Sequence, residues 1–85
     1  MPHEVLYHRD AAKQLERPKD KTFEKIQEEI DGLANDPRPV GVEKIGEDEY
    51  RIRVGDWRII YFINDKDKVI LISGVRRRNE STYKR

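Results

Sequence analysis

The chain contains no cysteine and only two histidines, His3 and His8, both near its amino end. Without cysteine there can be no disulfide, no thiolate zinc site and no cysteine nucleophile. Two histidines alone do not supply the ligands of a metal cluster. We therefore expect a protein that works without a bound metal or other cofactor.

Long hydrophobic runs are also missing, and only 35% of the 85 residues are apolar. No stretch approaches the roughly 18 apolar residues of a membrane-spanning helix. Residues 1–4 lack the charged and apolar regions that begin a signal peptide. A chain of this length forms one domain with a small core and marginal stability. We expect a single soluble, cytoplasmic domain over residues 1–85 that has no membrane partner.

Apolar residues at helical spacing predict two helices in the first half of the chain. The first begins near Asp10 and ends at Pro18, because proline cannot continue a helix. The second is more regular, with one charged face and one apolar face. Its apolar face contains Phe23, Ile26, Ile30 and Leu33. The prolines in residues 35–39 end this helix.

The remaining apolar segments predict strands. The first covers Val5, Leu6 and Tyr7, and residues 49–54 alternate apolar side chains with arginine. Residues 55–56 form a tight turn into an apolar strand at 57–63, and residues 64–67 turn the chain into a last strand from Val69. The order strand, helix, helix, strand, strand, strand predicts an α+β fold, with a helical hairpin on a small, twisted, mainly antiparallel sheet.

The net charge of +1 hides an uneven distribution of charge. Residues 1–49 contain eight basic and thirteen acidic residues, whereas residues 50–85 contain ten basic and four acidic ones. Arginines fall within two predicted strands and in the last ten residues, so one end of the sheet is expected to carry guanidinium groups. Guanidinium suits phosphate recognition. The simpler alternative is two solvated surfaces of opposite sign.

Several kinds of catalytic site can be excluded from the residues. Ser73 and Ser81 have no histidine nearby in sequence, and there is no glycine-rich phosphate loop. The acidic residues 47–49 are more typical of a solvated loop than of a cation site. Arginine and tyrosine remain, and such a set can cleave RNA without metal, because the 2′-hydroxyl is a built-in nucleophile. Surrounding positive charge lowers the cost of forming a tyrosine phenolate.

Residues 50–61, Tyr-Arg-Ile-Arg-Val-Gly-Asp-Trp-Arg-Ile-Ile-Tyr, and the six-residue spacing from Arg77 to Tyr83 resemble the RelE toxins of type II toxin–antitoxin systems, within the RelE/ParE superfamily. The resemblance covers essentially the whole chain. It implies a ribosome-dependent endoribonuclease, an mRNA interferase that cuts messenger RNA in the A site and inhibits translation. The products would be a 2′,3′-cyclic phosphate and a 5′-hydroxyl.

The resemblance also implies roles for individual residues. Tyr83 would be the general base, and Arg58 and Arg77 would hold the scissile phosphate. Arg51 and Arg53 stand where the family often has catalytic lysines, and arginine is the poorer proton donor. The residues expected to bind RNA phosphates are Arg51, Arg53, Arg76, Arg78 and Lys84.

Other interpretations of these residues stay open. Arg51 and Arg53 could form the solvent face of a strand, and Arg58 could pair with Asp56 or Glu49. The principal alternative function is a ParE-like DNA gyrase poison on the same fold, without catalytic residues, and a third is an inert family member. The expected partners of the nuclease are a RelB-like antitoxin, mRNA and the A site of the small (30S) ribosomal subunit.

Overall fold

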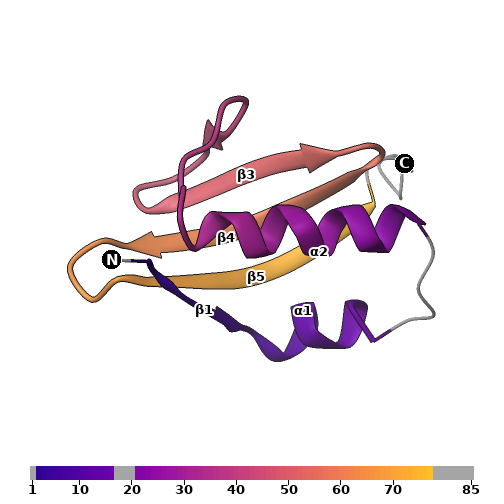
Figure 1. Ribbon diagram of the computed structural model, residues 1–85, viewed down its shortest axis with the longest axis horizontal. Helices are drawn as coiled ribbons and strands as arrows, with labels where there is room; N and C mark the ends of the chain where they lie inside the picture. The colour runs from indigo at the N-terminus through magenta and orange to yellow at the C-terminus, as the bar shows by residue number, and fades with distance from the viewer. Residues whose placement is uncertain (1, 17–20, 78–85) are drawn as a thin grey trace.

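The protein is an α+β structure in which two helices pack on a five-stranded sheet (Figure 1), seen here as a computed structural model that describes residues 2–16 and 21–77. Its elements are β1 (Glu4–Tyr7), α1 (Arg9–Gln14), α2 (Lys21–Leu33), β2 (Glu43–Lys44), β3 (Glu49–Val54), β4 (Trp57–Asn64) and β5 (Val69–Arg77). The strand order is β1-β5-β4-β3-β2. The predicted fold class is confirmed, and the structure adds the two-residue strand β2 within the expected polar loop.

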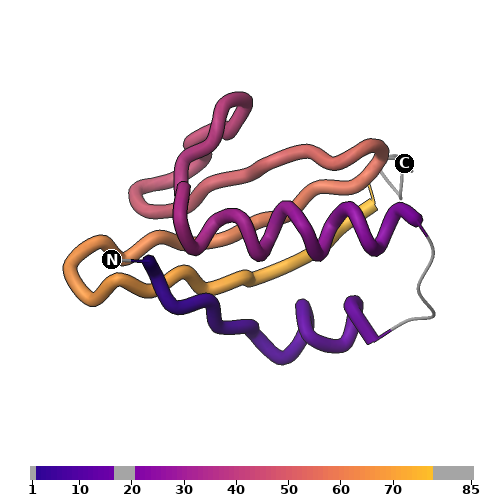
Figure 2. Tube along the Cα trace, in the orientation of Figure 1, coloured from indigo at the N-terminus to yellow at the C-terminus, as the bar shows by residue number. Residues whose placement is uncertain are grey.

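The sheet is mixed because its first and last strands lie side by side. β1 pairs in parallel with β5, with Glu4 opposite Val69, while the other three strand pairs are antiparallel. A parallel pair needs a long connection, and here the two helices and three intervening strands supply it. The trace in Figure 2 shows β1 and β5 along one side of the sheet, far apart in sequence but adjacent in space.

Both helices lie on the same face of the sheet and run in opposite directions (Figure 1). The four apolar residues predicted for α2, Phe23, Ile26, Ile30 and Leu33, are all buried. They pack with Ala11 of α1 and with the inward residues of the strands, among them Ile52, Ile59, Ile70 and Ile72. The amphipathic pattern of α2 therefore fixes which sheet face is covered, and within residues 2–16 and 21–77 no helix covers the opposite face.

The first helix is shorter than the pattern predicted and begins one residue earlier. His8 is its N-cap, because the Nδ1 atom of His8 accepts a hydrogen bond of 3.1 Å from the backbone N–H of Asp10. Side chains that accept this bond satisfy an otherwise unpaired N–H in the first turn. The helix ends at Gln14, ahead of Pro18, which lies outside the described residues. His8 thus has a structural role.

The alternation predicted for β3 is present in the structure. Tyr50, Ile52 and Val54 are buried against the helices, and the residues between them face the other side of the sheet. Gly55, with φ of 61°, starts the two-residue turn into β4, where a left-handed backbone favours glycine. The tight turn holds Arg53 directly opposite Arg58.

β5 contains one residue more than β4 over their paired length. Ile60 lies opposite Gly74, whereas Tyr61 lies opposite Ile72, so Ser73 has no partner in the ladder. The hydroxyl of Ser73 donates a 3.1 Å hydrogen bond to the carbonyl of Ile60. This β-bulge changes which face each later residue of β5 occupies, because side chains alternate with a period of two.

A polar cluster joins the loop after α2 to the start of β3 and to the turn between β4 and β5. Arg38 donates a 2.8 Å hydrogen bond to Asp65 and a 3.2 Å hydrogen bond to the hydroxyl of Tyr50. His3 lies 3.3 Å from the same Asp65 carboxylate. The hydrogen bond to Asp65 raises the pKa of Arg38 most, and the hydrogen bond to Tyr50 raises it further. The same bond from Arg38 lowers the pKa of Asp65. The cluster holds the loop against the β4–β5 turn.

We expect Tyr61 to make the fold sensitive to alkaline pH. Its fully buried hydroxyl donates a 2.8 Å hydrogen bond to the carbonyl of Pro37, and burial raises the pKa of Tyr61 to about 12. The neutral phenol is thus favoured in the folded state, so its stabilisation is present below about pH 10 and is lost as the pH rises toward 12. In Tyr61→Phe the free energy of unfolding should fall less steeply with rising pH. At neutral pH this variant should be less stable than the parent by about 1 kcal/mol, because it loses the hydrogen bond.

Urea unfolding at neutral and alkaline pH checks this expectation. Tyr7→Phe, which changes an exposed tyrosine, is the matched control and should keep the parental alkaline dependence. If Tyr61→Phe loses stability with rising pH as steeply as the parent, a different group is responsible.

Candidate functional site

Three arginines form a row across the sheet face opposite α1 and α2. Arg58 of β4 lies directly opposite Arg53 of β3 on one side and Arg76 of β5 on the other. Directly opposed residues project from the same face, and neighbouring strands are about 4.8 Å apart. Three guanidinium groups therefore start from adjacent points on one surface, here called the open face.

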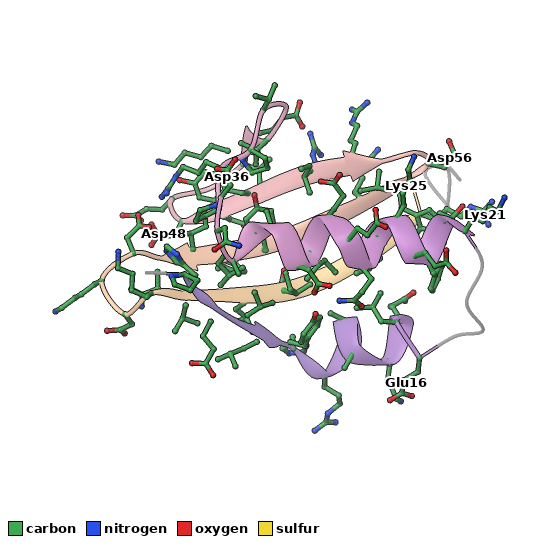
Figure 3. The ribbon with its side chains drawn as sticks, viewed as in Figure 1. Glu16, Lys21, Lys25, Asp36, Asp48 and Asp56 are labelled. Carbon is green, nitrogen blue, oxygen red and sulfur yellow. The ribbon has the colours of Figure 1, made fainter. Side chains whose placement is uncertain are left out.

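Arg58, at the centre of the row, has an unusual environment. Its side chain is partly buried, and its Nε atom is buried without a hydrogen-bond partner in the described part of the chain. Within residues 2–16 and 21–77, neither Asp56 nor Glu49 forms an ion pair with it. Asp56 lies at the turn between β3 and β4 (Figure 3). A buried donor without an acceptor costs about 1–3 kcal/mol, and an incoming oxyanion would relieve that cost.

Arg51 lies two residues before Arg53 on β3, on the same open face, and it has a carboxylate partner. Its Nε donates a 2.9 Å hydrogen bond to Glu43 Oε1, and its Nη2 donates to the same oxygen. The hydrogen bond from Arg51 lowers the pKa of Glu43, and the positive charges of Arg53 and Arg58 lower it further. Glu43 therefore belongs to the basic site and is ionised there at neutral pH.

Arg77 projects from the other face of the sheet. It lies opposite Trp57 in the strand register, and its guanidinium carbon is 5.8 Å from the centre of the Trp57 ring. The Trp57 ring in turn packs edge-on against Phe23 of α2, with ring centres 5.3 Å apart. Arg77 thus contacts the end of the core beneath α2, while Arg76 beside it joins the open face.

Beyond the arginines, the open face carries a cluster of apolar side chains, with Glu4, Glu49 and Asn64 around it. Leu6 and Phe62 are exposed, and Leu71, which lies directly opposite both in the register, is half-buried. Ile60 separates this apolar part from the arginine row along β4. The open face is therefore basic near the β3–β4 turn, and toward β1 it carries an apolar cluster flanked by acidic side chains.

The structure brings together four of the predicted site residues, Arg51, Arg53, Arg58 and Arg76, on the open face. Arg77 lies on the opposite face, and its predicted role stays a prediction. Arg78, Tyr83 and Lys84 lie outside the described residues. Glu43 is a member of the site that the sequence pattern missed. Only the pairing of β2 with β3, which sets Glu43 opposite Arg51, reveals it.

Chemically, this arrangement can bind a phosphate group from one side of the sheet. Arginine donors hold phosphate oxygens by charge-assisted hydrogen bonds and neutralise charge that develops during reaction. In the described ranges no group of histidine and acidic residues could hold a metal ion. No helix in those ranges has the length and apolar character needed to cross a membrane.

Comparisons with known proteins show the family and the fold of this chain. Residues 5–82 match the model of the ParE toxin of the type II toxin–antitoxin system parDE. The chain is similar to a chain of the archaeal RelE–RelB complex from Pyrococcus horikoshii, with 31% identity, a TM-score of 0.78 and coverage of 95% of this chain and 100% of that chain. No curated protein matches it.

Two further solved structures share the fold at lower identity. The isolated RelE toxin of E. coli is 18% identical, with a TM-score of 0.80, over 94% of this chain and 88% of that one. The RelBE2 toxin–antitoxin complex of Mycobacterium tuberculosis contains a chain that is 21% identical, with a TM-score of 0.76, over 92% of this chain and 100% of that one. The two helices on a mixed five-stranded sheet are therefore the fold of RelE toxins.

The Glu43 carboxyl group is expected to titrate below its usual range because Arg51 donates to it. In Arg51→Gln the pKa of Glu43 should move back toward its ordinary value of 4.5, since the hydrogen bond and the largest nearby charge are both removed. Carbon-detected NMR of the side-chain carboxyl groups across acidic pH measures this shift. Arg9→Gln, which changes an exposed residue of α1, is the control. An unchanged Glu43 titration in Arg51→Gln would contradict the pairing.

Proposed function

The chain belongs to the ParE toxin family of type II toxin–antitoxin systems and has the RelE fold, and we propose that it acts as a ribosome-dependent endoribonuclease on messenger RNA. In this proposal it cuts mRNA in the ribosomal A site and thereby inhibits translation in the cytoplasm. The reaction needs no metal, because the nucleophile is part of the RNA. The 2′-hydroxyl loses its proton and attacks the adjacent phosphorus, the bond from phosphorus to the 5′-oxygen breaks, and that oxygen takes up a proton, so a 2′,3′-cyclic phosphate and a 5′-hydroxyl remain.

The arginines of the open face would carry the electrostatic part of this reaction. Arg58 would donate to a non-bridging oxygen of the scissile phosphate, where negative charge grows in the transition state. Arg51 and Arg53 would contact flanking phosphates, with Arg51 exchanging its hydrogen bonds to Glu43 for bonds to RNA. The resemblance to RelE toxins supports Tyr83 as the base that removes the 2′-hydroxyl proton, and Arg78 and Lys84 as further phosphate contacts.

The observation that carries this proposal is the buried Arg58 Nε without an acceptor, between Arg53 and Arg76. A row of positive charge with an unpaired buried donor at its centre favours an anionic ligand over a purely structural role. An extended anion would contact more of this surface than a small one, because Arg51 continues it along β3 once its hydrogen bonds to Glu43 are exchanged. A nucleic-acid backbone is both extended and anionic.

The test is cleavage of ribosome-bound mRNA. The purified protein is added to ribosomes stalled on a defined messenger, and RNA ends are mapped by primer extension. Arg58→Gln should slow cleavage by about 100- to 1,000-fold, because it removes the central donor to the phosphate. Lys25→Gln, which neutralises an exposed residue of α2 (Figure 3), should cleave at the parental rate.

Each result of this test is informative. Cuts in the A site that disappear in Arg58→Gln but persist in Lys25→Gln support the proposal. Equal cleavage by the parent and a folded Arg58→Gln variant would remove Arg58 from the reaction. A folded parent that makes no cuts would reject the nuclease function.

A DNA gyrase poison is the second candidate function, and the match to the ParE toxin model over residues 5–82 favours it. Such a protein would trap gyrase on DNA without using catalytic residues. A supercoiling assay with purified gyrase distinguishes the two functions. Inhibition of gyrase together with absence of mRNA cleavage would support the second candidate.

We further propose that an antitoxin covers the open face. Solved structures similar to this chain include RelE–RelB complexes, and a RelB-like chain with acidic and amphipathic segments would fit a surface that is basic at one end and apolar at the other. An equimolar amount of the cognate antitoxin should abolish mRNA cleavage. Phe62→Asp should weaken the toxin–antitoxin complex, measured by calorimetry, by roughly tenfold or more, because it places a charge in the apolar part. Unchanged affinity would place the antitoxin elsewhere.

A further inference from the structure

We propose that Arg76, rather than Arg77, is the third arginine of the phosphate-binding row, and that Arg77 anchors the end of β5 to the core through Trp57. The inference rests on the proposed function, since it names the residue that would contact the RNA phosphate. It reverses the roles implied by the resemblance to RelE toxins, in which Arg77 holds the scissile phosphate and Arg76 is one of several RNA phosphate contacts.

The β-bulge at Ser73 is the reason for this exchange of roles. Ile70 and Ile72 of β5 face the helices, so uninterrupted alternation would bring residues 74 and 76 to the helix side and Arg77 to the open face. The unpaired Ser73 reverses the alternation, so that Val75 faces the core and lies opposite Ile59. Arg76 is thereby set opposite Arg58, and Arg77 opposite Trp57.

The side chain of Arg76 has the freedom that a phosphate contact needs. It is exposed, and no ion pair with an acidic residue of the described ranges holds it. Its Nε lies 3.4 Å from the position that a Cβ atom on Gly74 would take, so the side chain folds back over this glycine. Gly74 is in the same row of the sheet as Arg51 and Ile60. Arg76 therefore leans over the basic part of the open face.

The contacts of Arg77 indicate a structural role instead. Its guanidinium lies over the Trp57 ring, and cation–π contacts of this kind stabilise a protein modestly. The ring is held edge-on by Phe23, which is buried in the core. To reach a phosphate beside Arg58, Arg77 would have to leave this contact and cross to the other face of the sheet.

The two adjacent arginines allow a matched comparison, because Arg76→Gln and Arg77→Gln remove the same charge one residue apart. Binding of the full-length protein to a short single-stranded RNA is measured by fluorescence anisotropy, with 2′-O-methyl groups that block cleavage. Arg76→Gln should weaken binding roughly tenfold. It should also reduce the slope of the logarithm of the binding constant against the logarithm of salt concentration by about 0.7, because one phosphate contact is lost. Arg77→Gln should weaken it only about two- to threefold, the general effect of losing one positive charge.

Stability measurements should show the opposite order. Arg77→Gln is expected to lower Tm by about 2–8 °C and to shift the emission of Trp57, the one tryptophan of the chain. Arg76→Gln should leave both properties close to the parent. If Arg76→Gln is poorly folded, Arg76→Lys keeps the charge but loses the two-pronged geometry, and it should still bind RNA more weakly than the parent.

The outcomes separate this inference from the proposed nuclease activity. Equal or greater loss of RNA binding in a folded Arg77→Gln variant overturns the assignment of Arg76, as does absence of RNA binding by the parent. A parent that binds RNA through Arg76 but leaves ribosome-bound mRNA uncut supports the assignment and rejects the nuclease function. A parent that cuts mRNA but binds RNA through Arg77 supports the function and rejects the assignment.

Discussion

The two faces of the sheet are the constraint on which the rest of this structure depends. Side chains alternate between the faces, and α1 and α2 cover only one of them. A small core of isoleucine, tyrosine and valine side chains fills the covered face. Because burial on that face supplies most of the available hydrophobic stabilisation, the opposite face can carry four arginines and an unpaired buried donor.

Local patterns predicted the elements of the fold well, because each depends on neighbours in sequence. The helical spacing from Phe23 to Leu33 and the turn at Gly55 are examples. The membership of the site was less predictable, because strand register decides it. Nothing near Ser73 in the sequence indicates that β5 has one residue too many, yet this residue determines which arginine meets Arg58. Likewise, Glu43 joins the site through β2, which is too short to leave a pattern.

The uneven charge of the chain becomes a difference between two sides of the folded molecule. The exposed residues of α2 include four acidic side chains, Glu24, Glu28, Glu29 and Asp31, on the side away from the sheet. The arginines gather on the open face instead. The electrostatic potential therefore differs between the two sides of the molecule, and the arginine row is the side that favours an anionic ligand. Glu43 moderates the attraction locally by occupying Arg51.

The parallel pairing of β1 with β5 has a consequence for synthesis of the protein. Val5 lies opposite Ile70, so a strand made at the start of the described chain finds its sheet partner only after more than sixty further residues have emerged. Contacts over such separations form slowly, because a large loop must close before they contribute. During translation, the helices and the β3–β4 hairpin can form before β1 has a place in the sheet. A growing chain therefore completes the surface that includes Arg76 only after β5 has been made and has paired with β4.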